Sequence, residues 1–446
     1  MDIIDNLIDR ISDKNNKVKY NRQFFKHKIF PFFTREPERV KYKNGFQGIL
    51  GATSRISLSL QPEYQMNDHP ISTELLDVDF VSSNLETDFL NFFTNSQTLS
   101  SLNHPFLINY LPNSDGNDIK GEVEIALLLN QLLDLHSRES WKEIVGDKEY
   151  TNLFEKIIMD SIVNLKSAES KNDYIVFNKE NFKYLSKDLE YLTKNKDFFM
   201  RNIGRFLAFY YFQYLIQTSL YLNNFENTST DFIPLYFTLD SEKITSTRQS
   251  VKQGFNMITN LRKDLLVNEN IIGYLNFLNE SENTYPVQDL INSKSKDSLN
   301  EKLELFIKSY ESLTEKNNSF DVKGMYDNKL LNNIYKLKKY LLDDIQLETQ
   351  SRYFKSIDEI GNLYFLKSRG KLGKILTLDV NMIILLTTLI VKDEKVILSN
   401  VFIEFERRGV WFDRYTKEKI VDLYEKINIL EKKSDSGEAK YVKPIL

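Results

Sequence analysis

Residues 398–427 read LSNVFIEFERRGVWFDRYTKEKIVDLYEKI and decide the fold that the sequence predicts for the C-terminal part of the chain. The first half has the three- and four-residue apolar spacing of a short amphipathic helix, which Gly409 ends. Thr416 is a candidate N-cap for a second helix of the same kind. The two expected apolar faces are Leu398, Val401, Phe402 and Phe405, and Ile420, Leu423, Tyr424 and Ile427.

The flanking residues complete a recognisable order of elements. The apolar run 378–390 predicts a further helix before this stretch. After it, the extended runs 429–433 and 439–443 flank the Gly-containing turn 434–437, which indicates a β-hairpin. Three helices followed by a hairpin is the order of a winged helix, a helix-turn-helix with a β-wing. We therefore expect a mainly α protein with a C-terminal winged helix.

Candidate DNA contacts lie at the start of the expected recognition helix, on the wing, and just before the module. They are Arg414, Lys417 and Lys419; Lys432, Lys433 and Lys440; and Arg369, Lys371 and Lys374. However, residues 376–446 carry twelve basic and twelve acidic side chains, whereas a duplex-binding domain normally has a basic surplus. Including residues 367–374 raises the net charge to +4. Because fold alone does not decide function, DNA contact and protein docking both stay open.

The preceding part of the chain predicts helices. Three apolar stripes between residues 298 and 366 indicate a small helical bundle or arm, opened by a capping box at Ser298 and Glu301. Residues 279–296 are polar and read as a linker. The expected domains are a mostly helical 1–280, a bundle or arm 297–368, and a winged helix 369–446.

Two features of the N-terminal half suggest further elements. Residues 203–222 are almost wholly apolar and predict a buried central helix. Gly45, Gly48 and Gly51 read as a GxxGxxG loop before a strand at 56–60, although the spacing fits no phosphate-binding motif.

Composition narrows the class of protein. The 446-residue chain is 41% hydrophobic and 27% charged, which is ordinary for a globular protein. It has no cysteine, which excludes disulfides, cysteine-based zinc sites and thiol nucleophiles. The first residues lack the basic and apolar parts of a signal peptide. Arg205, Gln213 and Gln217 interrupt the longest apolar stretch, so we expect no membrane span and a cytoplasmic location.

Charge is distributed unevenly. Residues 14–43 contain ten Lys or Arg and two Glu, with aromatic residues between them, whereas residues 56–119 contain nine acidic residues and no Lys or Arg. Basic residues interleaved with rings suit single-stranded nucleic acid, but core aromatics with solvated lysines give the same pattern. The acidic and basic blocks can serve partners or pack on each other.

No catalytic or metal motif stands out. His27, His69, His104 and His136 are not paired at metal-ligand spacing. Asp77 and Asp79 are candidate Mg²⁺ ligands for phosphodiester cleavage, but no Lys lies near them in the sequence. Glu431-Lys-Lys433 matches only half of a nuclease signature. We expect no cofactor, no metal and no enzymatic activity from this chain alone.

Several segments resemble a known family. They are Phe365-Leu-Lys-Ser-Arg-Gly-Lys-Leu-Gly373, Phe402-x-x-Phe405-x-x-Arg-Gly409-Val-Trp-Phe-Asp413, Ser434-Asp-Ser-Gly437 with Tyr441-Val, Pro234-Leu-Tyr-Phe237 and Ser246-x-Arg248. Together they are similar to DptG, a family of bacterial DNA phosphorothioation-dependent restriction systems. The close similarity covers about eighty C-terminal residues.

The resemblance implies a partner of the ATPase subunits DptF and DptH in an antiviral defence complex, and it brings no catalytic residue. The first interpretation is a DNA-associating scaffolding subunit of such a restriction system. The alternatives are a protein adaptor that does not touch DNA, and a divergent metal-dependent nuclease that uses Asp77 and Asp79.

Overall fold

The computed structural model describes residues 2–12, 18, 26–34, 39–62, 104–114, 116, 118–316, 326–433 and 439–446. Within these residues the protein is mainly helical, as predicted, with small β-sheets. Asp77, Asp79, His69 and the turn 434–437 lie outside the described residues.

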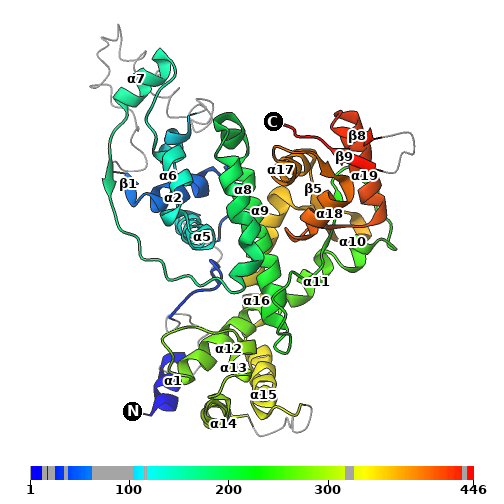
Figure 1. Ribbon diagram of the computed structural model, residues 1–446. Helices are drawn as coiled ribbons and strands as arrows, with labels where there is room; N and C mark the ends of the chain where they lie inside the picture. Colours follow the sequence, from blue (N-terminus) through cyan, green and yellow to red (C-terminus); the bar gives the residue numbers. More distant parts are fainter. Residues whose placement is uncertain are drawn as a thin grey trace.

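Helix α9 (Lys196–Asn223) forms the centre of the molecule, as the apolar run 203–222 predicted. Figure 1 shows α9 between helices α2, α5 and α6 on one side and α17 and α18 on the other. Every residue of α9 from Phe206 to Leu222 is buried, so the helix is apolar nearly all round. Its Gln213 and Gln217 donate to the backbone carbonyls of Gly409 and Ile233. No helix in the described part of the chain is long and apolar enough to cross a membrane.

The glycines of the GxxGxxG segment lie mainly in a helix, which corrects the predicted loop and strand. Gly48 and Gly51 belong to α2 (Gln47–Ser57), and strand β1 (Leu60–Pro62) begins only afterwards. A Cβ on Gly48 would lie 2.5 Å from Oε2 of Glu122 in α5 (Asp118–Leu133), and one on Gly51 would lie 2.5 Å from the carbonyl oxygen of Leu111. The three-residue spacing therefore places glycine on the helix face that needs close approach.

Several short elements lie between α2 and α9 in the chain, and η4 (Pro105–Tyr110), η5 (Leu135–Ser137) and β1 pack on α2. β1 pairs antiparallel with β2 (Leu165–Ser167). The others are α6 (Glu139–Gly146), α7 (Leu153–Ser161), η6 (Lys179–Phe182) and α8 (Lys183–Leu192).

Three of the described rings of the basic N-terminal block are core residues. Phe30, Phe32 and Tyr42 are 0%, 1% and 7% exposed. The Phe30 and Phe32 rings stack with centroids 5.3 Å apart, and Phe32 packs edge-on against Tyr353. These three rings are therefore not free to stack on nucleic-acid bases.

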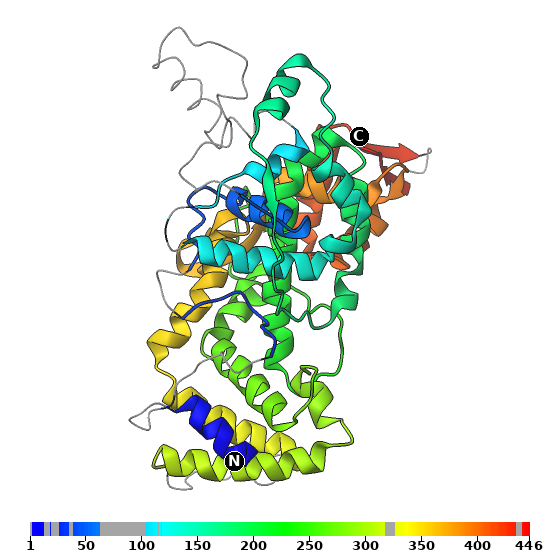
Figure 2. The ribbon, with the colours of Figure 1, turned by 90° about the vertical axis from the view of Figure 1, so that its left-hand side faces the viewer.

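The predicted striped helices lead from the lower end of the molecule up to its centre (Figures 1 and 2). They are α14 (Lys296–Leu313), α15 (Lys329–Asp344) and α16 (Leu347–Tyr364), and their stripes are buried. They do not form a bundle by themselves, because α12 (Asp264–Leu278) packs against all three. Helix α12 is buried nearly all round and needs cover on several faces. The N-terminal helix α1 (Ile3–Ile11) packs on α12 and α14.

Two local predictions in this region are wrong. Helix α14 begins at Lys296, so Ser298 lies inside it and forms no capping box. The expected linker 279–296 contains α13 (Val287–Ile291), whose Val287, Leu290 and Ile291 are buried. These three apolar residues outweigh the polar composition around them.

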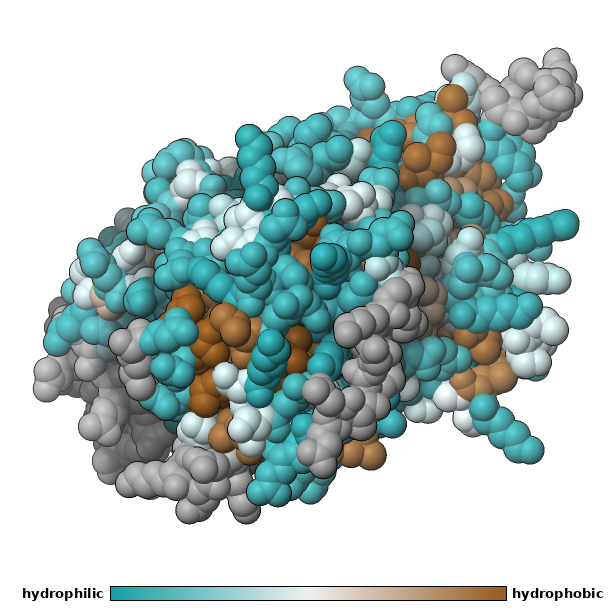
Figure 3. Space-filling view, turned by 90° about the horizontal axis from the view of Figure 1, so that it is seen from below, coloured by the Kyte–Doolittle hydropathy of each residue, from teal (hydrophilic) through white to brown (hydrophobic). Residues whose placement is uncertain are grey.

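Seen from below, the surface is mostly hydrophilic with small hydrophobic areas (Figure 3).

A four-stranded sheet joins segments that are distant in sequence. Its order is β4 (Leu366–Ser368), β5 (Lys374–Leu378), β3 (Tyr236–Leu239) and β7 (Trp411–Phe412). β3 runs parallel to both β5 and β7, and β4 runs antiparallel to β5 through the turn η8 (Gly370–Leu372). The elements α10 (Gln249–Lys252), α11 (Phe255–Thr259) and η7 (Asn260–Arg262) follow β3.

The C-terminal module, defined here as residues 380–446, contains the three predicted helices and both predicted hairpin strands. The helices are α17 (Val380–Val391), α18 (Leu398–Glu406) and α19 (Arg414–Lys426). The hairpin strands are β8 (Leu430–Lys433) and β9 (Ala439–Val442), and β6 (Val396–Ile397) pairs with β9. The N-cap of α19 is Asp413, not Thr416, and Ile427 is 37% exposed instead of buried. A carboxylate directly before the helix is the better-placed acceptor for the Thr416 N–H.

Candidate functional site

The basic residues predicted on the recognition helix do lie on α19, and each has a carboxylate partner. The pairs are Arg414 with Glu418 (2.9 Å), Lys417 with Glu406 (3.3 Å) and Lys419 with Asp422 (3.1 Å). The Arg414 side chain is 87% exposed. The positive charge of these three side chains is therefore balanced locally by their neighbours.

The predicted wing lysines lie on the β8–β9 hairpin. Lys432 and Lys440 are directly opposite each other in the antiparallel register. Lys432 pairs with Glu425 of α19 at 3.3 Å, and the side chain of Lys433 is outside the described residues. Lys440 lines a shallow hollow of about 470 Å³ between α19 and β9. Its lining residues are Phe412, Arg414, Lys417, Glu418, Val421, Asp422 and Lys440.

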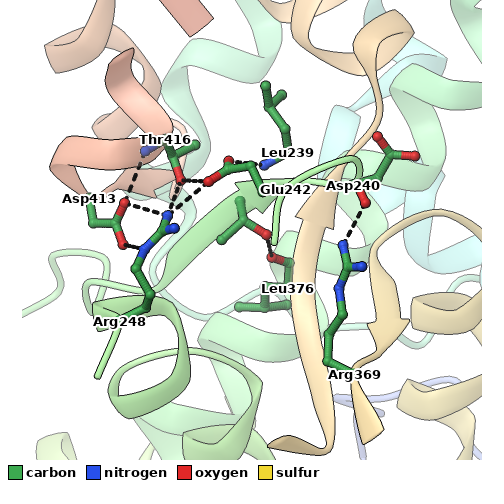
Figure 4. A network of polar contacts seen from close by, with 9 residues as sticks. Leu239, Asp240, Glu242, Arg248, Arg369, Leu376, Asp413 and Thr416 are labelled. Carbon is green, nitrogen blue, oxygen red and sulfur yellow. Dashed lines mark hydrogen bonds and ion pairs between the residues drawn. The ribbon is translucent and has the colours of Figure 1, made fainter. Parts of the chain in front are cut away.

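The remaining three candidates lie elsewhere, on the β4–β5 hairpin. Arg369 donates from Nη2 to the backbone carbonyl of Asp240 at 2.5 Å. Lys374 donates to Oδ1 of Asp358 at 2.7 Å. Lys371 is exposed and has no acidic partner among the described residues. Figure 4 shows Arg369 on one side of β3 and β5 and Asp413 on the other, so the nine candidates form two separate groups.

A buried ion-pair network fixes the start of α19. Arg248 donates from Nε to Oδ2 of Asp413 at 2.6 Å and from Nη2 to Oδ1 at 2.7 Å (Figure 4). The same Nη2 donates to Glu242 at 2.9 Å and to the Thr416 hydroxyl at 2.9 Å. The Arg248, Glu242 and Asp413 side chains are 8%, 5% and 10% exposed. Burial acts to raise the pKa of Asp413, but hydrogen bonds from Arg248 and Thr416 outweigh it and lower that pKa below 3.8.

A second buried ion pair fixes the end of α18. In this pair the arginine comes from the module and the carboxylate from the body of the protein. Arg408 donates to both carboxylate oxygens of Asp188 in α8, at 2.6 and 2.7 Å, and the two side chains are 3% and 0% exposed. Tyr210 of α9 donates to the same carboxylate at 2.6 Å. The body of the protein thus supplies an arginine to the module, and the module supplies one to the body. Both pairs hold the module firmly against α8, α9 and the segment after β3.

Each of the three parallel strands ends directly before an aspartate: Asp240 after β3, Asp379 after β5 and Asp413 after β7. The carboxyl edge of parallel strands is where open sheets commonly bind ligands. Here each carboxylate already faces a cation: Asp240 faces Lys367 at 3.7 Å, Asp379 faces Arg205 at 2.7 Å, and Asp413 faces Arg248. These aspartates therefore anchor the sheet edge and do not form an open cation site.

Sequence reasoning missed this edge, although the chain contains a signal for it. Thr238-Leu239-Asp240 and Thr377-Leu378-Asp379 are the same tripeptide, and the two copies pair in register in β3 and β5. This repeated Thr-Leu-Asp sequence is the signal from which a parallel strand pair could have been predicted.

The described histidines have local structural roles. His104 is fully buried, accepts from the N–H of Phe106 and lies 2.8 Å from the carbonyl of Glu149. Burial lowers its pKa. His27 contacts Thr284, and His136 contacts the carbonyl of Ser57. Over the described ranges, no three His, Asp or Glu side chains come together in a way that could hold a metal ion.

No protein-family model and no curated protein matches the chain.

Proposed function

We propose that this protein is a non-catalytic scaffolding subunit that docks a partner protein through its C-terminal module. The observation that carries the proposal is the charge balance of α19, where Arg414, Lys417 and Lys419 each have a carboxylate partner. A helix that reads duplex DNA normally presents a surplus of unpaired basic groups. A locally neutral face loses less electrostatic energy when it is covered by another protein.

We take the module to be a winged helix. The support is its order of elements, α17, β6, α18, β7, α19, β8 and β9, together with the sheet order β6-β9-β8; β7 pairs with β3 outside the module. In that arrangement α19 takes the recognition position and β8–β9 forms the wing. Such modules serve as protein-docking units as well as DNA readers, so the surface has to decide between them.

The surface of the module offers apolar anchors for a partner. Tyr415 in α19, Ile403 in α18 and Ile397 in β6 are 61%, 45% and 42% exposed. The hollow beside α19 has Phe412 and Val421 in its lining. Aromatic and aliphatic anchors surrounded by polar residues are typical of protein interfaces.

The nature of the assembly is proposed from the DptG resemblance. Three of the segments that carry it, around residues 234–237, 365–373 and 402–413, supply strands to one sheet. Arg248, from a fourth segment, bonds Asp413 at the end of the third. The support is thus that the similar residues form one continuous structural unit. On this basis the partners are DptF- and DptH-like ATPases of a phosphorothioation-dependent restriction complex.

Co-expression with the partner ATPases tests the proposal. We expect the purified chain to co-elute with them, and Ile403→Glu to weaken binding at least tenfold in a titration. The matched control is Leu305→Glu, which alters a 51% exposed leucine on α14 far along the chain from the module. Separate elution of folded components at micromolar concentration, or an equal effect of both variants, would contradict docking through the module.

A further inference from the structure

Unbalanced positive charge is greater at the β4–β5 hairpin than on α19. Lys367 and Arg369 both donate to the backbone carbonyl oxygen of Asp240, at 3.2 and 2.5 Å. Two cations thus share one neutral acceptor. The Asp240 carboxylate, 39% exposed, lies 3.7 Å from Lys367. Like charges held this close repel each other and favour the arrival of an anion.

The other strand of the hairpin repeats this imbalance. Lys374 and Arg262 share the single carboxylate of Asp358, at 2.7 and 3.6 Å. Lys371, at the turn, is exposed and without an acidic partner among the described residues. The group therefore contains five cations and two carboxylates, a net charge of +3. On α19 each candidate cation has a carboxylate partner instead.

The hairpin also lacks the anchors that a protein partner would need. None of residues 366–374 is a large, exposed apolar side chain. The backbone at the turn is uncovered, since a Cβ on Gly370 would contact nothing within 4 Å. Gly370 and Gly373 have φ of +56° and +75°, which lets the turn stay narrow. A narrow turn with cations and no exposed apolar anchor suits phosphate oxygens, which need only donors and charge.

We propose that the β4–β5 hairpin contacts the phosphate backbone of duplex DNA, while α19 is left for protein docking. The contacting groups are Lys367, Lys371 and Lys374, and Arg369 positions the hairpin against the end of β3. The choice of DNA among polyanions rests on the proposed function. The contact carries no base specificity, because charged side chains at phosphates set position and not sequence.

Titration of the full-length protein with a fluorescent 20-base-pair duplex at several salt concentrations tests the proposal. Each phosphate contact contributes about −0.9 to the slope of log affinity against log salt. Lys367→Ala with Lys371→Ala should therefore reduce the slope by about 1.8. Between about 50 and 200 mM salt, the wild-type affinity should fall about tenfold more than that of the double variant.

Two comparison variants separate local contact from net charge. Lys142→Ala with Lys171→Ala removes the same charge from a lysine of α6 and one of the segment after β2, which pair with Glu139 and Asp173, and should leave the slope unchanged. Lys419→Ala with Lys432→Ala removes two positive charges from α19 and β8. If the double hairpin variant does not fold, Lys371→Ala alone should reduce the slope by about 0.9.

An equal or larger loss in the α19 variant would overturn the assignment to the hairpin, as would undetectable binding at low salt. Polyglutamate that binds as tightly as the duplex would overturn the assignment to DNA. Partner co-elution is measured separately on the same hairpin variant and should be unchanged. If the hairpin variant co-elutes with the partner and its salt slope for DNA is unchanged, only the DNA-contact inference is wrong. If Ile403→Glu and Leu305→Glu both lose co-elution, the docking proposal is wrong.

Discussion

Arg248 and Asp413 are 165 residues apart in sequence, yet the guanidinium group donates to both carboxylate oxygens, at 2.6 and 2.7 Å. The pair joins the segment after β3 to the first turn of α19, and both side chains are nearly buried. A bidentate arginine–carboxylate pair fixes orientation as well as distance. The pair therefore fixes the first turn of α19 to the body of the protein, beside the buried Ile420 and Tyr424 farther along the helix.

Replacement of Arg248 by Leu should be strongly destabilising. It leaves the buried carboxylates of Glu242 and Asp413 without their shared cation, and breaking such a buried pair costs about 3–5 kcal/mol. Arg248→Lys should recover little of this, because an ammonium group cannot make the bidentate contact. Urea denaturation measures the free energy of unfolding. A loss below about 1 kcal/mol would show that the network is not needed to hold α19.

Asp413 should also make the stability of the protein sensitive to acid. Because its folded-state pKa lies below the ordinary value of 3.8, the ionised carboxylate adds stability above that value. This contribution is lost as the pH falls through the folded-state pKa. Asp413→Asn keeps a capping side chain for α19 but lacks the titrating group. Unfolding free energies of the two proteins should differ most near pH 7 and converge below about pH 3.8, and a constant difference would contradict the assignment.

The parts of the fold that could be predicted are those with a local period. Helices α9 and α14 to α19 have apolar residues at helical spacing or in continuous runs, and the sequence indicates them directly. The β8–β9 hairpin has a Gly-containing turn between extended runs. In each case the residues that determine the element lie within the element.

The β4-β5-β3-β7 sheet could not be assembled in this way. Its strands have two to five residues, too few for a reliable alternation, and the β3–β5 pair spans a long separation in the chain. The cost of closing such a loop is met by contacts that only the folded core supplies. Likewise, the candidate cations were identified as residues, but their partners Glu418, Glu406 and Asp422 were not. Those partners decide whether the charge on α19 is available.

A further prediction concerns nuclease activity of the purified chain without its partners. We expect no metal-dependent cleavage of duplex DNA by the purified protein with Mg²⁺ or Mn²⁺. The reason is that the described residues bring no metal-ligating group together, and residues 56–119 contain no Lys or Arg to support Asp77 and Asp79. A gel-based nicking assay provides the measurement. Cleavage that disappears in Asp77→Ala and in Asp79→Ala would restore the nuclease interpretation.

The packing of α2 on Leu111, the residue after η4, makes Gly51 the most restricted of the helical glycines in this region. A Cβ there would lie 2.5 Å from the backbone oxygen of Leu111, which cannot rotate away as a side chain can. Gly51→Ala should therefore cost about 1–3 kcal/mol of unfolding free energy through overpacking. Gly204 in α9 is the matched control, because a Cβ there meets nothing within 4 Å.

Gly204→Ala should instead gain about 0.5–1 kcal/mol, since alanine loses less backbone entropy than glycine when a helix forms. Chemical denaturation of the two variants side by side gives the comparison. At Gly48 the obstacle is the carboxylate of Glu122, which is 2% exposed and bonded to the N–H and hydroxyl of Ser114 at 2.9 and 2.6 Å. Gly48→Ala should consequently be destabilising as well, because moving Glu122 breaks those bonds. Stability equal to wild type in both variants would contradict this packing: Gly48→Ala tests the close approach of α2 to Glu122 of α5, and Gly51→Ala tests its close approach to Leu111.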